Sequence, residues 1–316
     1  MHSWTGNLVT HKNYEHFWLK EAFTVFLERK VTASFIRDEE ESKRYRDFES
    51  LQGLLILRET VSELGENNPL TKLVLDIEDV HPDDAFSRIP YEKGSLFMRY
   101  LESQVGGPAK FEEFTRSYIN TFQRKSLDTE QFKAYFLKYF EDNECPCPID
   151  SIDWDAWLHN SGMPPVIPDY DMSMANAIST LLAKINKKNV TLHYSDVKEF
   201  TPHQVIYLLQ QLLDSSALDL TKLRTLGNEY KIAESKNSDI KYRWLRLCIR
   251  SKDDTVLNDV YEFINQQGRM NYVRPIYRDL YAWEEVRQQT IANFLENEPR
   301  MIHVSAYTIR KDLHLN

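Results

Sequence analysis

The sequence predicts a mainly α-helical protein built from two domains. Apolar residues recur with the 3.6-residue period of an amphipathic helix through most of its 316 residues. Strand-like patterns are sparse, and the best candidate for an extended segment is Thr71–Val80. Three prolines within Ser161–Asp171 forbid a helix there and favour an extended linker. We therefore expect a first domain over residues 1–160, a linker over residues 161–171 and a second domain over residues 172–316.

The predicted helices of the first domain carry start and stop signals. Gly106 and Gly107 end one amphipathic run, and Asp128 is placed to cap another, with Gln131 three residues further on. The runs that predict these helices are Tyr14–Val31, Arg44–Leu57, Gly94–Gly107, Phe111–Phe122 and Asp128–Asp142.

The second domain reads as an antiparallel array of helices joined by short polar turns. Thr201 is expected to cap one of them, with Pro202 at its first position and Gln204 completing a capping box. No clean repeat period is visible, so the repeat class stays open at this point. The runs are Met172–Ile185, Thr201–Ser215, Leu220–Ile232, Ser238–Lys252, Asp254–Gly268, Val273–Trp283 and Glu284–Glu298.

Composition narrows the class of protein. A formal net charge of −9, with no block of Lys and Arg, argues against nucleic acid as the main partner. The sequence has no apolar run near the roughly 20 residues that a membrane span needs, and it does not begin like a signal peptide. Its 3 cysteines favour a reducing compartment, with the cytoplasm as the expected location. We expect Cys145 and Cys147 to be free thiols in a loop and Cys248 to lie in the core.

The residues nearest the N-terminus carry the strongest chemical signal. His2 precedes Glu21 by nineteen positions. In zinc peptidases a helix with the pattern H-E-x-x-H supplies two histidines one turn apart, and a glutamate from the next helix closes a three-ligand site. The fourth position stays open for water, and the motif glutamate takes its proton. His2 and Glu21 fit the second histidine and the later glutamate of this arrangement.

Longer segments support this interpretation. The segments HSWTGNLVT and HFWLKEAFTVFLER resemble the zinc-site region of the leukotriene A-4 hydrolase family, a branch of the M1 aminopeptidases. The likeness continues in order through PYEKG, YDM, RWLRLCI and GRM…RP…DL. It implies a partial thermolysin-like catalytic domain followed by an armadillo- or HEAT-like helical domain. It also implies one zinc ion, removal of N-terminal residues from peptides with a free N-terminus, and a lipid epoxide as a further expected substrate.

The resemblance assigns roles to individual residues. Tyr91 matches the tyrosine whose hydroxyl stabilises the oxyanion, and Asp83 matches an acid that directs water in the epoxide reaction. Arg269 matches the arginine that binds the substrate carboxylate. The full set is His2 and Glu21 as metal ligands, Tyr91 and Asp83 as catalytic residues, and Arg269 and Phe86 as substrate-binding residues. Taken singly, the same residues would be read as core aromatics or as charges at helix ends.

Several positions depart from the family pattern. Lys20 and Ala22 flank Glu21 where the family usually has Asn and Gly, and Lys20 is expected to weaken metal binding. Phe86 replaces a pocket tyrosine, and Asn271 replaces a lysine. These two changes bear on the epoxide reaction and on carboxylate affinity.

The family's first zinc histidine and general-base glutamate are expected upstream of Met1, which falls at the last variable position of the motif. The family's β-rich domain and its amine-binding G-x-M-E-N-type segment have no match in the printed residues either. We therefore expect this chain by itself to bind zinc weakly and to show no peptidase activity. The alternative is a catalytically inactive pseudoenzyme whose helical domain serves as a protein-binding scaffold. An unrelated helical interaction protein is disfavoured by the length of the match.

Overall fold

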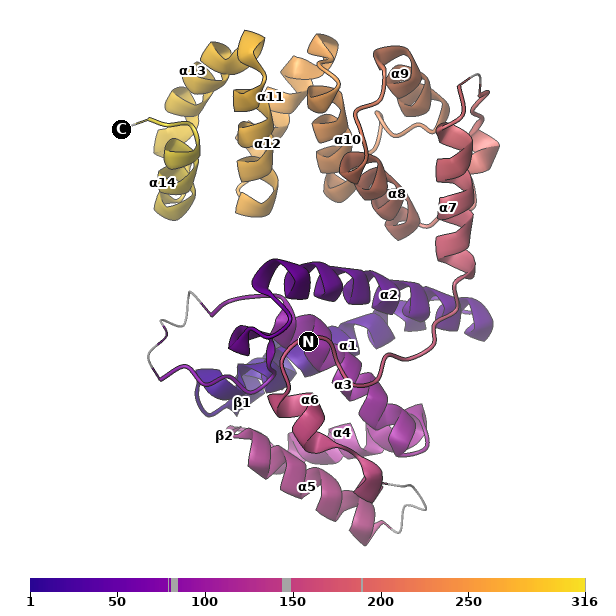
Figure 1. The fold of residues 1–316 in the computed structure, drawn as a ribbon, viewed down its shortest axis with the longest axis vertical. Coiled ribbons are helices and arrows are strands. Elements are labelled where there is room, and N and C mark those ends of the chain that lie inside the picture. The colour runs from indigo at the N-terminus through magenta and orange to yellow at the C-terminus, as the bar shows by residue number, and fades with distance from the viewer. Residues whose placement is uncertain (79, 81–84, 144–148, 189, 316) are drawn as a thin grey trace. The chain divides into compact units, whose positions relative to one another are not determined.

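The computed structural model describes residues 1–78, 80, 85–143, 149–188 and 190–315. Over these residues the chain is mainly helical, as predicted, and it forms two compact units, Met1–Met174 and Ala175–Asn316 (Figure 1). Within the described parts of the chain, no helix combines the length and the apolar character that a membrane crossing needs.

The first unit is a cluster of helices with short connecting turns. The helices are α1 (Phe17–Ser34), α2 (Glu39–Leu64), α3 (Ile89–Gln104), α4 (Pro108–Phe122), α5 (Thr129–Asp142) and α6 (Trp154–His159). The single turns are the π-helical η1 (Ser3–Leu8) and the 3-10 turns η2 (Tyr14–His16), η3 (Pro69–Thr71) and η4 (Ile149–Ser151).

Local capping explains where several of these helices begin and end. The predicted capping box of α5 is present, because the Asp128 side chain accepts from the Gln131 backbone and the Gln131 side chain from the Asp128 backbone. Gly106 and Gly107 adopt positive φ angles of 90° and 104°, which favour glycine, and they end α3 as predicted. Pro108 then starts α4 at a position where its missing N–H costs nothing.

The strands lie elsewhere than the sequence suggested. β1 (Val9–His11) and β2 (Lys125–Leu127) pair in parallel, with Val9 opposite Lys125. The described residues of Thr71–Val80 form no strand, and the Val74 backbone N–H donates to the carbonyl of Leu158 instead. Strands of three residues are too short to show the alternation that sequence reading depends on.

The core of the first unit contains many aromatic rings. The Phe114 ring lies 5.1 Å from that of Phe136 and 5.6 Å from that of Phe111. Burial of each such side chain contributes roughly 2–3 kcal/mol. The fully buried aromatic residues of this unit are Trp18, Phe23, Phe48, Phe97, Phe111, Phe114, Phe132, Phe136 and Trp157.

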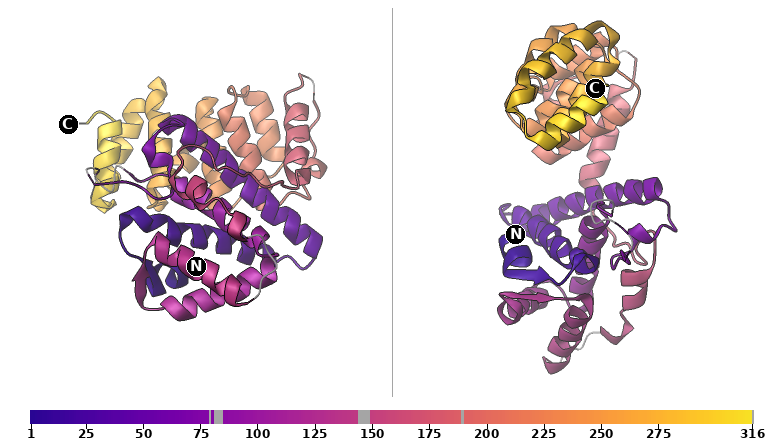
Figure 2. Two further views of the ribbon diagram at one scale, coloured as in Figure 1. Left: turned by 60° about the horizontal axis from the view of Figure 1, so that its bottom comes forward. Right: turned by 90° about the vertical axis from the view of Figure 1, so that its left-hand side faces the viewer.

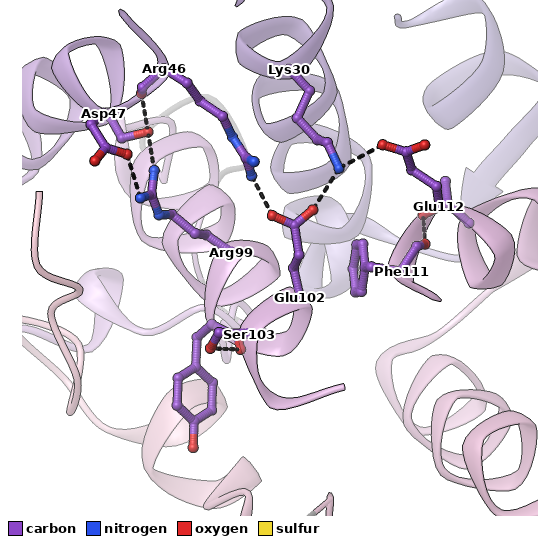
Figure 3. A network of polar contacts seen from close by, with 11 residues as sticks. Lys30, Arg46, Asp47, Arg99, Glu102, Ser103, Phe111 and Glu112 are labelled. Atoms are coloured by element: carbon purple, nitrogen blue, oxygen red, sulfur yellow. Dashed lines mark hydrogen bonds and ion pairs between the residues drawn. The ribbon is translucent and has the colours of Figure 1, made fainter. Parts of the chain in front are cut away.

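A network of partly buried charges joins α1, α2 and α3 (Figure 3). Glu102 of α3 binds Lys30 of α1 and Arg46 of α2, each at 2.6 Å. Arg99 binds Asp47 at 2.6 Å, so α2 and α3 are joined a second time. Because every one of these charges has a partner, the network fixes the three helices without leaving a buried ion unpaired.

The segment rich in prolines lies against the first unit. The Arg99 guanidinium stacks over the Tyr170 ring at 4.9 Å, and the Asp171 backbone N–H donates to Asp47 at 3.0 Å. Cys248 is completely buried in the second unit, as predicted. The expectation for Cys145 and Cys147 falls outside the described residues.

The second unit stacks its helices in succession (Figures 1 and 2). Its helices are α7 (Ser173–Ile185), α8 (Pro202–Asp214), α9 (Leu220–Glu229), α10 (Ser238–Arg250), α11 (Leu257–Gln266), α12 (Met270–Ala282), α13 (Arg287–Asn297) and α14 (His303–Asp312). The 3-10 turns are η5 (Tyr194–Asp196), η6 (Asp254–Val256), η7 (Glu284–Val286) and η8 (Glu298–Arg300). The capping box predicted for α8 at Thr201 and Gln204 is present.

A ladder of arginine contacts runs through this stack. The helices α8, α10, α12 and α14 pack one against the next, while α9, α11 and α13 lie beside them. The rungs join residues 33, 33 and 38 positions apart, although the sequence shows no clean repeat. They are Arg243 to Gln210, Arg246 to Asp279, and Arg274 to Asp312.

The stability of the second unit should depend on pH through Asp253. Its buried carboxylate accepts two hydrogen bonds from Arg224, at 3.1 and 2.8 Å, and these bonds lower the pKa of Asp253 to about 2. The folded pKa lies below the unfolded value of about 3.9, so the stabilisation is present above pH 4 and lost as pH falls toward 2. We expect Asp253→Asn to cost about 2 kcal/mol at neutral pH.

Hydrogen exchange of the α9 and α10 amides across a pH series measures this effect. The difference between the protein and D253N should shrink below pH 4. The matched control is Asp254→Asn, at the exposed neighbouring position. A difference that stays constant down to pH 2 would contradict the role of the Arg224 pair.

Candidate functional site

The site is built where α1 and α3 approach closely. A Cβ atom on Gly94 would lie 2.7 Å from the Cβ atom of Ala22, so only glycine permits this approach. Glu21 precedes Ala22 on α1, and Tyr91 lies one turn before Gly94 on α3. Close packing of the two helices therefore places a ligand-type carboxylate near a phenol.

His2 reaches Glu21 through the π-helical turn η1. The Nε2 atom of His2 lies 3.8 Å from Oε2 of Glu21. Thr5 within η1 is buried, and its hydroxyl contacts the hydroxyl of Thr24 on α1 at 3.1 Å. This contact fixes η1 against α1, so packing holds the histidine beside the glutamate.

The Glu21 side chain is buried, and its charge is only partly neutralised. Its side chain is 2% exposed, and burial raises its pKa, while Lys20 and His2 act in the opposite direction. The Lys20 ammonium lies 3.4 Å from Oε1. The other oxygen, Oε2, is buried and has no hydrogen-bond partner. A buried carboxylate oxygen without a donor is costly, which indicates a cation-binding position.

The donors present fit part of a zinc site. Zinc in proteins is bound by imidazole nitrogen and carboxylate oxygen, and two ligands of one ion lie a few Å apart. His2 Nε2 and the free oxygen of Glu21 meet both conditions. Within the described residues, no group of three or more His, Cys, Asp or Glu side chains gathers at one point. The described residues therefore bring together two side chains of the kind that bind zinc.

Tyr91 belongs to a set of neighbouring aromatic rings. Its ring centroid lies 6.1 Å from those of Phe17 and Phe86, and Phe17 stacks on Tyr14 at 4.8 Å. Burial, followed by the negative charge of Glu21, raises the pKa of Tyr91 to about 12. The phenol therefore keeps its proton at neutral pH and remains a hydrogen-bond donor.

The structure brings together four of the six residues singled out from the sequence: His2, Glu21, Tyr91 and Phe86. Phe86 is 59% exposed, so a face of its ring remains open to a ligand. Arg269 belongs to the second unit, where its exposed guanidinium lies over the Tyr272 ring at 5.3 Å. Asp83 lies outside the described residues.

Sequence reasoning missed the part played by Lys93, within the PYEKG segment. Its side chain is completely buried, and its ammonium donates to the carbonyls of Thr71, Asn160 and Gly162 at 2.8–3.0 Å. Burial lowers the pKa of Lys93 to about 8. The lysine ties α3, two positions beyond Tyr91, to two connecting segments. The motif itself was the only signal in the sequence.

A cavity of about 600 Å³ in the second unit has a different character. It lies between α12 and α14 and is lined by Arg274, Arg278 and Asp312, among others. Both arginines bind Asp312, at 2.6 and 3.2 Å. These three charges therefore pair with one another and link α12 to α14.

Comparisons with known proteins find relatives for both parts of the chain. A model described as the peptidase family M1 domain matches residues 1–157, and one described as leukotriene A4 hydrolase, C-terminal, matches residues 200–313. A leukotriene A-4 hydrolase of Xenopus laevis is 41% identical over 319 residues, covering 100% of this chain and 51% of that protein. A leucine aminopeptidase 2 of Sclerotinia sclerotiorum is 35% identical, covering 99% of this chain and 50% of that protein.

Solved structures show the same relationship. Native leukotriene A4 hydrolase of Saccharomyces cerevisiae matches with a TM-score of 0.87 at 29% identity, covering 99% of this chain and 52% of that one. The yeast hydrolase in complex with bestatin matches with a TM-score of 0.85 at 30% identity, with the same coverage. The chain thus spans about half the length of the relatives it matches.

Replacing Lys93 tests how the Tyr91 end of α3 is held. In Lys93→Met three carbonyls lose their donor, two of them in buried hydrogen bonds, so we expect a loss of stability of about 3 kcal/mol or more. Urea denaturation measures the change. Lys43→Met, at an exposed position of α2, is the matched control and should change stability by less than about 0.5 kcal/mol. Equal stability losses for the two substitutions would show that the three hydrogen bonds of Lys93 do not contribute measurably to stability.

Proposed function

Because this chain belongs to the leukotriene A4 hydrolase branch of peptidase family M1, we propose that it supplies part of the site of a zinc-dependent aminopeptidase. Removal of N-terminal residues from peptides is the proposed activity, with hydrolysis of a lipid epoxide as a further proposed reaction. The observation that carries the proposal is the unpartnered buried oxygen of Glu21 facing His2, beside Tyr91.

The proposed roles follow from the chemistry of each group. His2 and Glu21 would hold the zinc ion, which when bound supplies Lewis acidity toward a peptide carbonyl. Tyr91 keeps its proton and donates a hydrogen bond to the oxyanion that develops during attack. Phe86, exposed beside Tyr91, contacts the substrate and excludes water from the oxyanion.

Substrate selection is proposed to involve two further residues. Arg269 is exposed, and a guanidinium keeps several donors for a carboxylate even when it stacks on a tyrosine. It would bind the carboxylate of a peptide or a fatty acid. For Asp83 the proposed role in the epoxide reaction rests on the sequence resemblance alone.

One observation favours a second candidate, a pseudoenzyme whose helical unit is a protein-binding scaffold. The ion pair between Lys20 and Glu21 partly neutralises a metal ligand, which an active metalloenzyme would not need. The stacked helices of the second unit are an architecture that suits protein binding. Metal binding and turnover distinguish the two candidates.

Completing the ligand set tests the zinc site directly. The 316-residue chain, with two ligands brought together, should bind zinc weakly. Extension by His-Glu-Ile before Met1 places H-E-x-x-H at His2 and should raise zinc affinity on the order of 100-fold. The matched control is an Ala-Glu-Ile extension, and Glu21→Gln in the extended chain should abolish the gain. Competition with a chromophoric chelator measures the affinity. Equal zinc affinities for the two extended chains would contradict the proposed site.

Activity is best measured on protein isolated from its native source, with its intact mass determined in the same sample. We expect the 316-residue form, of 37.4 kDa, to be inactive on an aminoacyl-anilide. A longer form should be active, inhibited by chelators and restored by zinc, and bestatin is the probe for its substrate site. In that form Tyr91→Phe should lower kcat by about 100-fold or more with zinc content unchanged. Tyr100→Phe on the same helix is the control. Zinc-independent turnover would overturn the proposal, and an inactive longer form would favour the scaffold.

A further inference from the structure

Lys20 adopts a geometry that its sequence position does not lead one to expect. It is the residue immediately before Glu21 on α1, and neighbouring helix residues normally point about 100° apart. Its Nζ atom nevertheless lies 3.4 Å from Oε1 of Glu21. The Lys20 side chain as a whole is 27% exposed.

Two neighbours hold the lysine side chain in this position. A Cβ atom on Gly6 would lie 3.2 Å from Cγ and 3.3 Å from Cε of Lys20, so the aliphatic stem passes directly over the glycine. The ammonium also lies 5.4 Å from the centroid of the Phe17 ring, within range of a cation–π interaction. The ammonium is therefore held on the carboxylate by packing on two sides.

The charge balance around Glu21 follows from this contact. One oxygen of the carboxylate faces the Lys20 ammonium, and the other faces His2 without a hydrogen bond. With a neutral residue at position 20, Glu21 would leave one negative charge for an incoming dication. With Lys20 the pair is neutral overall, and a dication bound by Glu21 would meet a like charge nearby.

We infer that Lys20 is a tethered counter-cation that competes with zinc for Glu21, so that this site binds zinc weakly and exchanges it with its surroundings. This inference rests on the proposed zinc site. The inference goes beyond the proposed site because it assigns to Lys20 the setting of its zinc affinity. The free zinc concentration at which the site fills would then depend on the residue at position 20.

Metal affinity is the measurement that tests it. Zinc dissociation constants are determined for the purified protein and its variants by competition with a chromophoric chelator, together with the rate at which excess chelator removes the metal. We expect Lys20→Asn and Lys20→Met to bind zinc about tenfold more tightly, equivalent to about 1.4 kcal/mol. They should also release zinc more slowly.

Three controls make the result specific to the charge at position 20. Lys20→Met keeps an unbranched side chain that packs on Gly6, so it is expected to keep its fold while losing the charge. Lys20→Arg keeps the charge and should bind zinc within about twofold of the unaltered protein. Lys12→Asn removes a charge that pairs with Asp128 instead of Glu21, and should have no effect. Raising the salt concentration should narrow the gap between the protein and K20M.

The outcomes separate this inference from the proposed function. Unchanged or weaker zinc binding in both K20N and K20M would overturn the competing role and assign Lys20 to holding Glu21 in place. If Glu21→Gln and His2→Ala also leave zinc binding unchanged, the proposed zinc site itself fails. Tighter binding in K20N and K20M, lost on adding E21Q, supports both.

Discussion

A Cβ atom at position 94 would lie 2.7 Å from that of Ala22, and this close approach of α1 and α3 is the constraint on which the site depends. It holds the helix that carries Glu21 directly against the helix that carries Tyr91. A second glycine works in the same way nearby. A Cβ atom on Gly53 of α2 would lie 2.1 Å from the Glu92 carboxylate, which binds Arg29 of α1 at 2.7 Å. At both positions the absence of a side chain on glycine allows two helices to come into close contact.

The buried ion pairs of the first unit fix how far its helices can slide along one another. Apolar and aromatic contacts tolerate small sliding movements, because the hydrophobic effect has no direction. Ion pairs at 2.6–2.7 Å do not, because a shift by one helical turn would leave a buried charge without its partner. Arg29 binds α3 to α1, Glu102 binds it to both α1 and α2, and Lys93 binds it to the connecting segments. The helix that carries Tyr91 is therefore held on several sides by polar contacts that form at only one position of the helix.

Much of this could be predicted from the sequence, and what could not has a common physical cause. The caps at Asp128 and Thr201 were predictable because capping involves residues three apart. The pairing of His2 with Glu21 was predictable because it follows a known ligand spacing. The strands, the bonds of Lys93 and the arginine ladder were not. Their partners lie far away in the chain, from 22 positions for Lys93 and Thr71 to 116 for β1 and β2, and no local pattern marks them.

The sequence shows that Lys20 departs from the family pattern, but it does not show that the side chain contacts Glu21. Its charge beside Glu21 is visible, but adjacent helix residues diverge, so contact requires space for the side chain to bend back. Gly6 provides that space. The pair then has opposite effects on two states of the protein. Without metal, the ammonium stabilises a buried carboxylate that would otherwise lack a counter-charge. With a metal ion bound as proposed, the same ammonium would repel the ion. Any substitution that improves metal binding at this position should therefore leave the metal-free protein less stable, and that coupling follows from the geometry alone.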